Sequence, residues 1–297
     1  MLKVIQINLQ HSRAASAALC ALFIAQKIDI ALIQEPWLVG GRVAGLSDSK
    51  GKLIYDVNSQ NVRACIVVNS ELQVLPLLEH FDRDLAVVSL KYSMAGVPKE
   101  LALAAAYLPY DSSSPPPSSV LEQLEVHCRT MRLQLIVGAD ANAHNVVWGS
   151  TDTNKRGEYL LEYITSTNFV ILNQGNDPTF VNRIREQVID ITLATPIISA
   201  QVSKWRVLEE PSHSDHRYIY MEVEDVGQPK CEYRNIRKTN WAEYRELLER
   251  RTSNMSTVVR SSLDIELVSS DLQEAIQTSY QESCPDSYHQ DGKVVEQ

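Results

Sequence analysis

Short apolar runs of strand length recur through most of this 297-residue chain, and several of them end in a polar side chain. Residues 30–34 lead directly into Glu35, and residues 133–137 lead through Gly138 to Asp140. Continuous apolar runs of roughly 4–8 residues are typical of strands that are buried on both faces. Because helix-like stretches separate these runs, the pattern predicts an α/β domain, with a mixed sheet and helices on its outer faces. The helices are expected at residues 14–26, 118–132 and 158–167, and further strands at residues 4–9, 64–68, 86–92, 101–107, 170–172, 188–193, 204–208 and 217–223.

The composition of the chain changes after Val226. Residues 230–251 are rich in charge, and residues 263–280 carry apolar side chains at helical spacing. The chain beyond Ser283 is polar, which is typical of disorder. We therefore expect one domain over residues 1–226 and a linker or truncated second module over residues 227–297, partly helical or disordered. A solvated helix pair without chemistry is the simplest interpretation of that tail.

Composition disfavours several classes of protein. The net charge of −9 argues against binding of nucleic acid by bulk electrostatics, although a carboxylate-lined metal site contributes negative charge of its own. No apolar run approaches the roughly 20 residues of a membrane span, and the N-terminus is strand-like rather than a secretory signal. The five cysteines have neither metal-ligand nor redox spacing, which favours free thiols in a reducing, intracellular compartment.

Two polar side chains end strand candidates near the N-terminus. Glu35 follows residues 30–34, and Asn8 ends the first strand. Ligand sites collect at strand ends in α/β folds, and a carboxylate there suits Mg²⁺, which takes one or two carboxylates and keeps several waters. Taken alone, Glu35 is more simply a surface residue before a turn-forming proline, and Asn8 is a strand-end amide.

The sequence Asp140-Ala141-Asn142 follows an apolar strand in which Gly138 permits close backbone approach. Residues two apart in an extended chain point to the same side, so Asp140 and Asn142 can both reach one water or one phosphate oxygen. An Asx-type turn accounts for the same residues equally well.

Asp190 stands between two isoleucines in an apolar strand, where an unpaired carboxylate is costly to bury. His216 is the best candidate partner, because an aspartate beside an imidazole fixes its tautomer and raises its pKa. The alternative is an edge strand on which Asp190 faces solvent. Asp215 directly precedes His216, but adjacent residues of an extended chain point opposite ways, so Asp215 is poorly placed to orient the imidazole.

Weaker candidates lie at other strand ends and loops. Tyr107 ends the strand at residues 101–107, where its phenol can contact a phosphate, although a core tyrosine is the commoner case. His144 can contact a substrate or cap the loop after Asn142, and no two histidines have zinc spacing. The sequence lacks the motifs of a phosphate-binding P-loop, a dinucleotide-binding fold and a serine-esterase elbow.

In chain order these residues resemble the catalytic set of the endonuclease/exonuclease/phosphatase family. Finer features resemble the apurinic-endonuclease-like endonuclease domain of non-LTR retrotransposons, and the resemblance extends over residues 2–224. The motifs that carry it include Gln34-Glu35-Pro36-Trp37, Asp140-Ala141-Asn142-Ala143-His144, Trp148-Gly149-Ser150 and Ser212-His213-Ser214-Asp215-His216. Val188 departs from many relatives, which have a small polar residue at that position.

The resemblance implies a four-layer α/β sandwich, with two packed mixed β-sheets and helices on the outer faces, as in deoxyribonuclease-I-like enzymes. It implies Mg²⁺-dependent cleavage of a phosphodiester in double-stranded DNA, with Mn²⁺ as a possible substitute, leaving a 3′-hydroxyl that primes reverse transcription. Residues 237–241 resemble the segment before a reverse transcriptase, so covalent continuity with that enzyme in a longer polyprotein and a nuclear location are implied as well.

The same resemblance assigns catalytic roles by position. Asp140 orients or deprotonates the attacking water, and Asn142 holds the phosphate. The pair of Asp190 and His216 stabilises the pentacovalent phosphate, and Tyr107 contacts the phosphate or the leaving oxygen.

Metal and DNA contacts are implied in the same way. Glu35 ligates the divalent metal, with Asn8 beside it and Asp215 as an outer carboxylate. Loops at residues 39–52 and 182–186 are candidates for contact with DNA, and the alternative is that both are ordinary solvated loops. The candidate DNA-binding residues are Arg42, His144, Arg183, Arg185 and Ser214.

Two other functions remain open. A related phosphoesterase, either an abasic-site repair endonuclease or an inositol-polyphosphate phosphatase, would use the same catalytic residues. A repair enzyme needs a cavity for a flipped or missing base, and a polyphosphate pocket needs clustered basic residues that the motifs do not supply. A catalytically dead DNA-binding derivative is disfavoured because the chain retains Glu35, Asp140, Asn142, Asp190 and His216.

Overall fold

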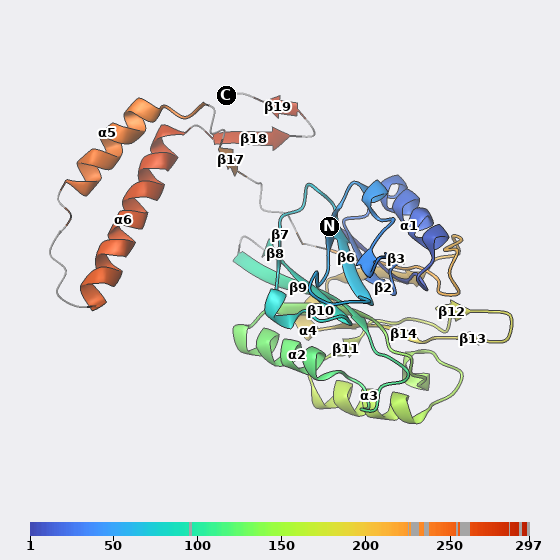
Figure 1. The fold of residues 1–297 in the computed structure, drawn as a ribbon. Coiled ribbons are helices and arrows are strands. Elements are labelled where there is room, and N and C mark those ends of the chain that lie inside the picture. The colour runs from blue at the N-terminus through green and yellow to red at the C-terminus, as the bar shows by residue number, and fades with distance from the viewer. Residues whose placement is uncertain are drawn as a thin grey trace. The chain divides into compact units, whose positions relative to one another are not determined.

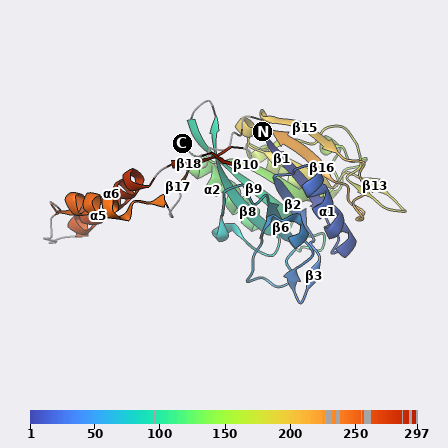
Figure 2. The same ribbon diagram turned by 90° about the horizontal axis from the view of Figure 1, so that it is seen from above.

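The structure is a computed structural model of the chain, and it describes residues 1–94, 97–224, 226, 232–234, 238–253, 255, 262–284, 286–290 and 293–295. The chain divides into two compact units, Met1–Gln228 and Pro229–Gln297. The larger unit is a layered α/β body, and the smaller one consists of two helices and short strands (Figures 1 and 2).

The larger unit is built on two six-stranded mixed sheets. In spatial order the first sheet contains β15 (Val202–Val207), β16 (Ile219–Val223), β1 (Leu2–Asn8), β2 (Ile30–Gln34), β6 (Ala64–Val68) and β5 (Lys52–Ile54). The second contains β11 (Val170–Ile171), β14 (Asp190–Ala194), β10 (Gln134–Asp140), β9 (Val97–Tyr107), β8 (Leu85–Met94) and β7 (Val74–Pro76). Each sheet has one parallel pair near its centre, β1 with β2 and β9 with β10, and its other pairs are antiparallel.

Alternation along the central strands explains how the layers stack. In β1, Val4 belongs to the apolar cluster between the two sheets, whereas Ile5 belongs to the cluster beneath helix α1 (Arg13–Ala25). Successive side chains of a strand point to opposite faces, so strands that are apolar throughout must be covered on both sides. Helices α2 (Ser119–Met131) and α3 (Lys155–Ser166) cover the outer face of the second sheet. Figure 1 shows α1 on one side of the stacked sheets and α2 and α3 on the other, which confirms the four-layer sandwich.

Each of these three helices begins at a polar cap. The side chains of Ser12, Ser118 and Asn154 accept hydrogen bonds from the backbone N–H groups of Ala15, Leu121 and Gly157, respectively. Such caps satisfy donors that the first helical turn leaves unpaired. The helices therefore begin within a few residues of the starts that the sequence predicts.

Short elements connect the main strands and helices. They are β3 (Leu38–Val39), β4 (Arg42–Val43), β12 (Phe180–Val181), β13 (Glu186–Gln187), α4 (Pro196–Ser199) and the 3₁₀ helices η1 (Ser47–Ser49), η2 (Leu78–His80) and η3 (Val146–Trp148). Strands β3 and β4 form one hairpin, and β12 and β13 form another that projects from the body in both ribbon views (Figures 1 and 2).

The smaller unit contains β17 (Glu232–Arg234), α5 (Trp241–Thr252), α6 (Ser262–Ser283), β18 (Asp286–Gln290) and β19 (Lys293–Val295). Helices α5 and α6 pack together, and Arg251 forms an ion pair with Glu282 at 2.7 Å. The sequence predicts disorder beyond Ser283, whereas the residues described there form β18 and β19, which pair with each other. Within the described residues, no helix is both long and apolar enough to cross a membrane.

Candidate active site

Polar side chains from both sheets meet where the central parallel pairs end. Asn8 stands beside Gln34 across β1 and β2, and Asp140 stands beside Tyr107 across β9 and β10. Asp140 also faces Asp190 across β10 and β14. The carboxyl ends of parallel strands are where ligands bind in open α/β sheets. The sequence places these polar residues at strand ends, and the sheet registers bring them to one edge of the sandwich.

Buried glutamines join the two sheets just behind this edge. Gln34 donates from Nε2 to the carbonyl of Gly138 at 2.9 Å, and Gln6 donates to the carbonyl of Ala139 at 3.2 Å. A Cβ atom at Gly138 would lie 2.8 Å from Gln6 Oε1. Glycine at this position therefore permits the close approach that lets the glutamines fix one sheet against the other.

The side chain of Asn8 connects two carboxylates. Its Nδ2 donates to Glu35 Oε2 at 3.0 Å and to Asp140 Oδ2 at 2.8 Å, while its Oδ1 accepts the backbone N–H of Gln10 at 2.7 Å. The reversed amide orientation would place an oxygen against two carboxylates, so the network fixes the assignment. Asn8 thus stands beside the carboxylates as a donor that holds them together.

Asp140 and Asp190 are equally buried carboxylates, each with 2% of its surface exposed. Asp140 Oδ1 accepts the backbone N–H of Asn142 at 3.1 Å, which is the Asx-turn contact. Burial and the neighbouring charge of Asp190 raise the pKa of Asp140 to about 7, while His216 and the hydrogen bond from Asn8 act in the opposite direction. A carboxyl group with this pKa can exchange a proton near neutral pH. The same motif therefore contains both an Asx turn and a buried carboxyl group that can exchange a proton.

Asp190 and His216 form a buried acid–base pair. His216 Nδ1 lies 2.8 Å from Asp190 Oδ2, and His216 Nε2 lies 3.9 Å from Asp140 Oδ2. Strand β14 lies between β11 and β10, so Asp190 is not on an edge strand. Burial alone lowers the pKa of His216, but the charge and hydrogen bond of Asp190 outweigh it and raise the pKa to about 9. The imidazole is therefore held as a cation with Nε2 directed toward Asp140.

Asp215 forms its hydrogen bonds with Gln10, whereas the His216 imidazole is paired with Asp190. Gln10 donates from Nε2 to Asp215 Oδ2 at 3.3 Å and accepts the backbone N–H of Asp215 through Oε1 at 2.8 Å. Ser214 donates from Oγ to the carbonyl of Asn8 at 2.8 Å and accepts the backbone N–H of His216 at 3.1 Å. These bonds attach the loop before β16 to the end of β1. Sequence reasoning missed Gln10, although its place two residues after Asn8 was a usable signal.

Tyr107 lies on the Glu35 side of the site. Burial, followed by the charges of Glu35 and Asp140, raises the pKa of the Tyr107 phenol, which also shares a hydrogen bond with Glu35. The Arg63 guanidinium lies 4.7 Å from the centre of the tyrosine ring and forms an ion pair with Asp84 at 2.5 Å. The phenol therefore stays protonated at neutral pH and is available as a hydrogen-bond donor. Arg63 is a second residue that the sequence did not single out.

The loop after Asp140 is held in place from several sides. Asn142 has a left-handed backbone (φ 46°), and its Nδ2 donates to the carbonyl of Leu108 at 3.3 Å. Arg156 donates from Nε to the Asn142 carbonyl at 3.1 Å. This arginine from α3 therefore positions the loop, although sequence analysis had given it no separate role.

His144 is fixed by the cap of α3. Its backbone N–H donates to Asn154 Oδ1 at 3.2 Å, and its Nδ1 lies 2.9 Å from Asp152 Oδ1. A Cβ atom at Gly157 would lie 1.8 Å from the His144 carbonyl oxygen, so only glycine lets the loop approach this helix. His144 is thus anchored by its backbone, and its ring is paired with an exposed aspartate.

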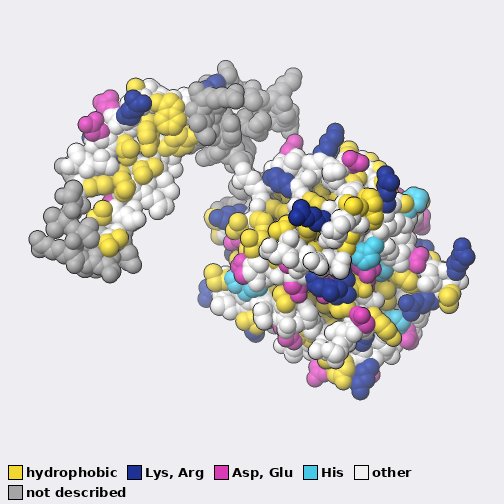
Figure 3. All heavy atoms as spheres, in the orientation of Figure 1, with side chains coloured by type: hydrophobic (Ala, Val, Ile, Leu, Met, Phe, Trp, Pro, Cys, Tyr) yellow, Lys and Arg dark blue, Asp and Glu magenta, His cyan; other side chains and the backbone are white. Residues whose placement is uncertain are grey.

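The remaining predicted contacts lie on exposed hairpins. Arg183, Ile184 and Arg185 are exposed between β12 and β13, and Ile184 is 91% exposed. This hairpin is joined to the acid–base pair, because the Phe180 ring lies 5.0 Å from the His216 ring and 5.1 Å from the Arg185 guanidinium. Arg42 is exposed on β4. Figure 3 shows basic and acidic side chains interspersed over the visible face of the larger unit, in keeping with the net charge.

The donor set of the site fits a hard divalent cation. Glu35 and Asp140 present carboxylate oxygens around one amide, and Asp140, Asp190 and His216 offer ligand atoms within 4.8 Å of one another. Asp190 Oδ1 is buried and has no hydrogen-bond partner. Oxygen ligands of this kind suit Mg²⁺. Burial, followed by the charge of Asp190, raises the pKa of Asp140, and a bound cation would favour its charged form.

Two packed mixed sheets, with carboxylates, amides and an Asp–His pair at their strand ends, have the architecture of the deoxyribonuclease-I-like fold. Comparison with known proteins agrees. The sequence profile of the family described as "Endonuclease-reverse transcriptase" matches residues 101–220. The putative 115 kDa protein in the type-1 retrotransposable element R1DM of Drosophila melanogaster is 27% identical over 234 residues, which cover 75% of this chain and 22% of that protein.

Solved structures give the same result. The endonuclease domain of TRAS1, a telomere-specific non-LTR retrotransposon, is 29% identical with a TM-score of 0.63, covering 75% of this chain and 99% of that one. An AP endonuclease from Archaeoglobus fulgidus shares the fold at 16% identity and a TM-score of 0.55, covering 75% of this chain and 100% of that one. The chain is therefore similar to proteins of the endonuclease/exonuclease/phosphatase family, and in particular to the endonuclease domain of a non-LTR retrotransposon.

Proposed function

We propose that residues 1–224 form a divalent-metal-dependent DNA endonuclease that nicks target DNA and leaves a 3′-hydroxyl to prime reverse transcription. The observation that carries the proposal is the buried trio of Asp140, Asp190 and His216, connected to Glu35 through Asn8. The likeness to the TRAS1 endonuclease domain supports DNA as the substrate. A repair enzyme or an inositol-polyphosphate phosphatase would use the same residues, but the AP endonuclease compared above is less similar to this chain than the TRAS1 domain is.

Asp140 accepts the proton of the attacking water, and His216 stabilises the negative charge that develops on the phosphate. Asp140, with its pKa raised to about 7, orients the attacking water and accepts its proton. His216, held protonated by Asp190, donates from Nε2 to a phosphate oxygen as negative charge develops there. Asp190 keeps the imidazole in the orientation that leaves Nε2 free for this contact. Cleavage of a DNA phosphodiester needs a large reduction of the barrier, so several such contributions must act together.

Neutral donors hold the phosphate. The side-chain amide of Asn142 reaches the phosphate after it exchanges its contact with the Leu108 carbonyl. The protonated phenol of Tyr107 donates to the phosphate or the leaving oxygen. Neutral donors placed before the reaction stabilise developing charge without the cost of burying a further ion.

Glu35 would hold the metal ion, with Asn8 beside it and Asp215 as an outer carboxylate; Mg²⁺ is the proposed identity, with Mn²⁺ as a substitute. When bound, the ion would supply Lewis-acid stabilisation of charge on the phosphate. Asn8 orients the carboxylates of Glu35 and Asp140, and Gln10 holds Asp215 near the same strand end.

DNA would be held by exposed side chains around the site. Arg183 and Arg185 on the β12–β13 hairpin contact the backbone of the duplex, and the exposed Ile184 between them contacts a groove. Arg42 on β4, together with His144 and Ser214, completes the proposed DNA contacts. Because the chain carries a net charge of −9, this local set supplies the attraction that bulk charge does not.

The setting of the enzyme is part of the proposal. The chain spans 22% of the length of its Drosophila relative, which is a retrotransposon protein. We infer that this domain is continuous with a reverse transcriptase in a polyprotein, that residues 227–297 lead toward it, and that the target is chromosomal DNA in the nucleus.

A substrate panel tests the proposal. Purified protein is incubated with supercoiled plasmid, an abasic duplex and inositol polyphosphates, with Mg²⁺, with Mn²⁺ or with EDTA. We expect metal-dependent nicking of plasmid, and nicks that DNA polymerase extends without prior end repair, since extension requires a 3′-hydroxyl. Cleavage of the abasic duplex alone, or release of phosphate from inositol polyphosphates alone, would contradict the retrotransposon endonuclease.

A further inference from the structure

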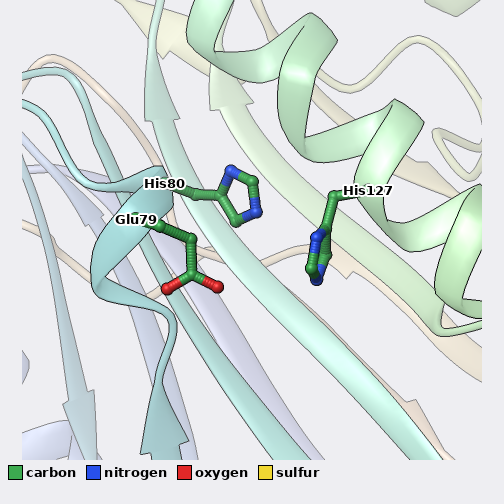
Figure 4. Close-up of side chains that lie close together, drawn as sticks. All are labelled: Glu79, His80 and His127. Atoms are coloured by element: carbon green, nitrogen blue, oxygen red, sulfur yellow. The ribbon is translucent and has the colours of Figure 1, made fainter.

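A second group of ligand-bearing side chains lies away from the residues described above. Glu79 and His80 extend from η2 toward His127 on α2 (Figure 4), and one ligand atom from each lies within 4.8 Å of the other two. The centres of the two imidazole rings are 4.6 Å apart. Neither η2 nor α2 supplies a residue to the candidate active site, so this group needs its own explanation.

His80 is the unusual member of the group. It is 7% exposed, and both of its ring nitrogens are buried without a hydrogen-bond partner. Buried polar groups are nearly always paired, and an unpaired one costs free energy because it has lost its bonds to water. A neutral imidazole has one ring nitrogen with a lone pair, which can bind a ligand. A partner that accepts this lone pair would remove the cost.

We propose that Glu79, His80 and His127 bind a transition-metal ion, with Zn²⁺ as the best fit. Two imidazole nitrogens and one carboxylate oxygen form a ligand set typical of zinc, whereas the all-oxygen sets preferred by Mg²⁺ and Ca²⁺ are absent from this cluster. Glu79 is exposed, so a water molecule can complete a four-coordinate site. The ion therefore differs in chemistry from the one proposed for the strand ends.

The geometry allows closure around one ion. Ligand atoms on a tetrahedral zinc lie roughly 3–3.5 Å apart, because each bond is about 2.0–2.2 Å long. The exposed Glu79 and the half-buried His127 can rotate toward the fixed ring of His80. Only side-chain rotation is needed, since η2 and α2 already pack together.

The site would act as a clamp on the outer face of the second sheet. Leu77 precedes η2 and belongs to the same buried cluster as Leu121 and Leu124 of α2. Phe81 follows η2 and packs against that cluster. A metal bound by both segments would therefore add a cross-link at the edge of an existing apolar contact, and it would stabilise the folded state by mass action.

Metal binding tests the inference directly. The EDTA-treated full chain is titrated with Zn²⁺ in excess Mg²⁺, with calorimetry and thermal unfolding as readouts, and with Co²⁺ as a visible-absorption probe of imidazole coordination. We expect one Zn²⁺ per chain at this site and a rise of Tm by several degrees at about a hundredfold excess over Kd. His127→Gln and Glu79→Gln should each weaken this binding by at least about tenfold and lose most of the rise in Tm.

A matched control is Gln123→Ala, which changes an exposed residue one helical turn before His127 and should bind Zn²⁺ as the parent does. Unchanged affinity and unchanged Co²⁺ absorption in both His127→Gln and Glu79→Gln would overturn the inference. So would loss of zinc binding in Asp140→Asn but not in His127→Gln, because the ion would then occupy the strand-end cluster. Because Glu79 and His127 are not core residues, a folding failure in both variants is not expected, and circular dichroism checks it.

Discussion

The two clusters of metal-ligating side chains differ in how the protein prepares them. Asp140, Asp190 and His216 are all buried, and an Asn8 amide and mutual hydrogen bonds hold them. In the cluster of Glu79, His80 and His127, the buried histidine has no hydrogen-bond partner and the carboxylate is exposed. The first cluster is thus organised before any ligand arrives, whereas the second gains its partner only when an ion binds. Preorganisation of the first kind suits catalysis, and the second suits a stabilising cross-link.

The largest expected effect concerns Asp140. Asp140→Asn should lower the nicking rate by at least about 10⁴-fold, because the group that orients and deprotonates water is lost. The Tm of the metal-free protein at pH 8 should not fall, since burial and Asp190 disfavour the Asp140 charge that the substitution removes. Plasmid nicking and thermal unfolding measure the two quantities. A matched control is Glu162→Gln on the exposed face of α3, which should nick as the parent does. Full activity of Asp140→Asn would show that the strand-end cluster is not catalytic.

The second effect concerns the partner of His216. Asp190→Asn should lower the nicking rate by about 10²-fold to 10³-fold, because the imidazole loses the charge that keeps it protonated and oriented. Asp215→Asn should have a smaller effect, since Asp215 bonds to Gln10 rather than to the imidazole. The comparison is made with kcat and KM for plasmid at saturating metal. The ranking is wrong if Asp215→Asn is the more damaging of the two.

The third effect is a pH dependence of stability in the metal-free protein. The pKa of His216 is raised to about 9 from its ordinary 6.5, so the folded state binds more protons than the unfolded state in this window. The stabilisation is fully present below about pH 6.5 and is lost as pH rises through about 9. The free energy of unfolding should therefore fall by about 1 kcal/mol per pH unit between pH 7 and 9. Urea unfolding in EDTA measures it, and His216→Gln should flatten the slope; an equal slope in that variant would assign it to another group.

The smallest expected effect sharpens the contrast between the clusters. His127→Gln should leave the nicking rate within about twofold of the parent, because neither η2 nor α2 contributes a residue to the candidate active site. The same variant should lose the rise of Tm with Zn²⁺. Nicking rates with Mg²⁺ and unfolding with Zn²⁺ are measured on one preparation. A large loss of nicking would mean that the two clusters are coupled.

Much of the fold was predictable from local pattern. The apolar runs at residues 30–34 and 133–137 correspond to β2 and β10, and the helix expected at residues 118–132 corresponds to α2, which Ser118 caps. Strand β14 begins at Asp190 rather than two residues earlier. Pairing decides that boundary, because Asp190 is the first residue in register with β10 and the residues before it bond elsewhere.

The candidate site was only partly predictable. The sequence marked Asn8 as a polar strand end, but it could not show that the amide nitrogen faces two carboxylates while the oxygen accepts from Gln10. Gln10 and Arg156 were given no role of their own, because a single polar residue carries no periodic signal. Nor could spacing along the chain reveal His80 and His127 as neighbours, since the zinc motifs read from sequence are short and local.

The amino-acid sequence by itself determined the buried strands, their polar ends and the order of the candidate catalytic residues, because alternation, apolar runs and helix caps act over a few neighbouring residues. The tertiary structure decided which of those ends meet, how Asn8 is turned, and that η2 lies against α2. Such contacts depend on sheet register and on the packing of segments that are distant in the chain, and local chemistry does not encode them.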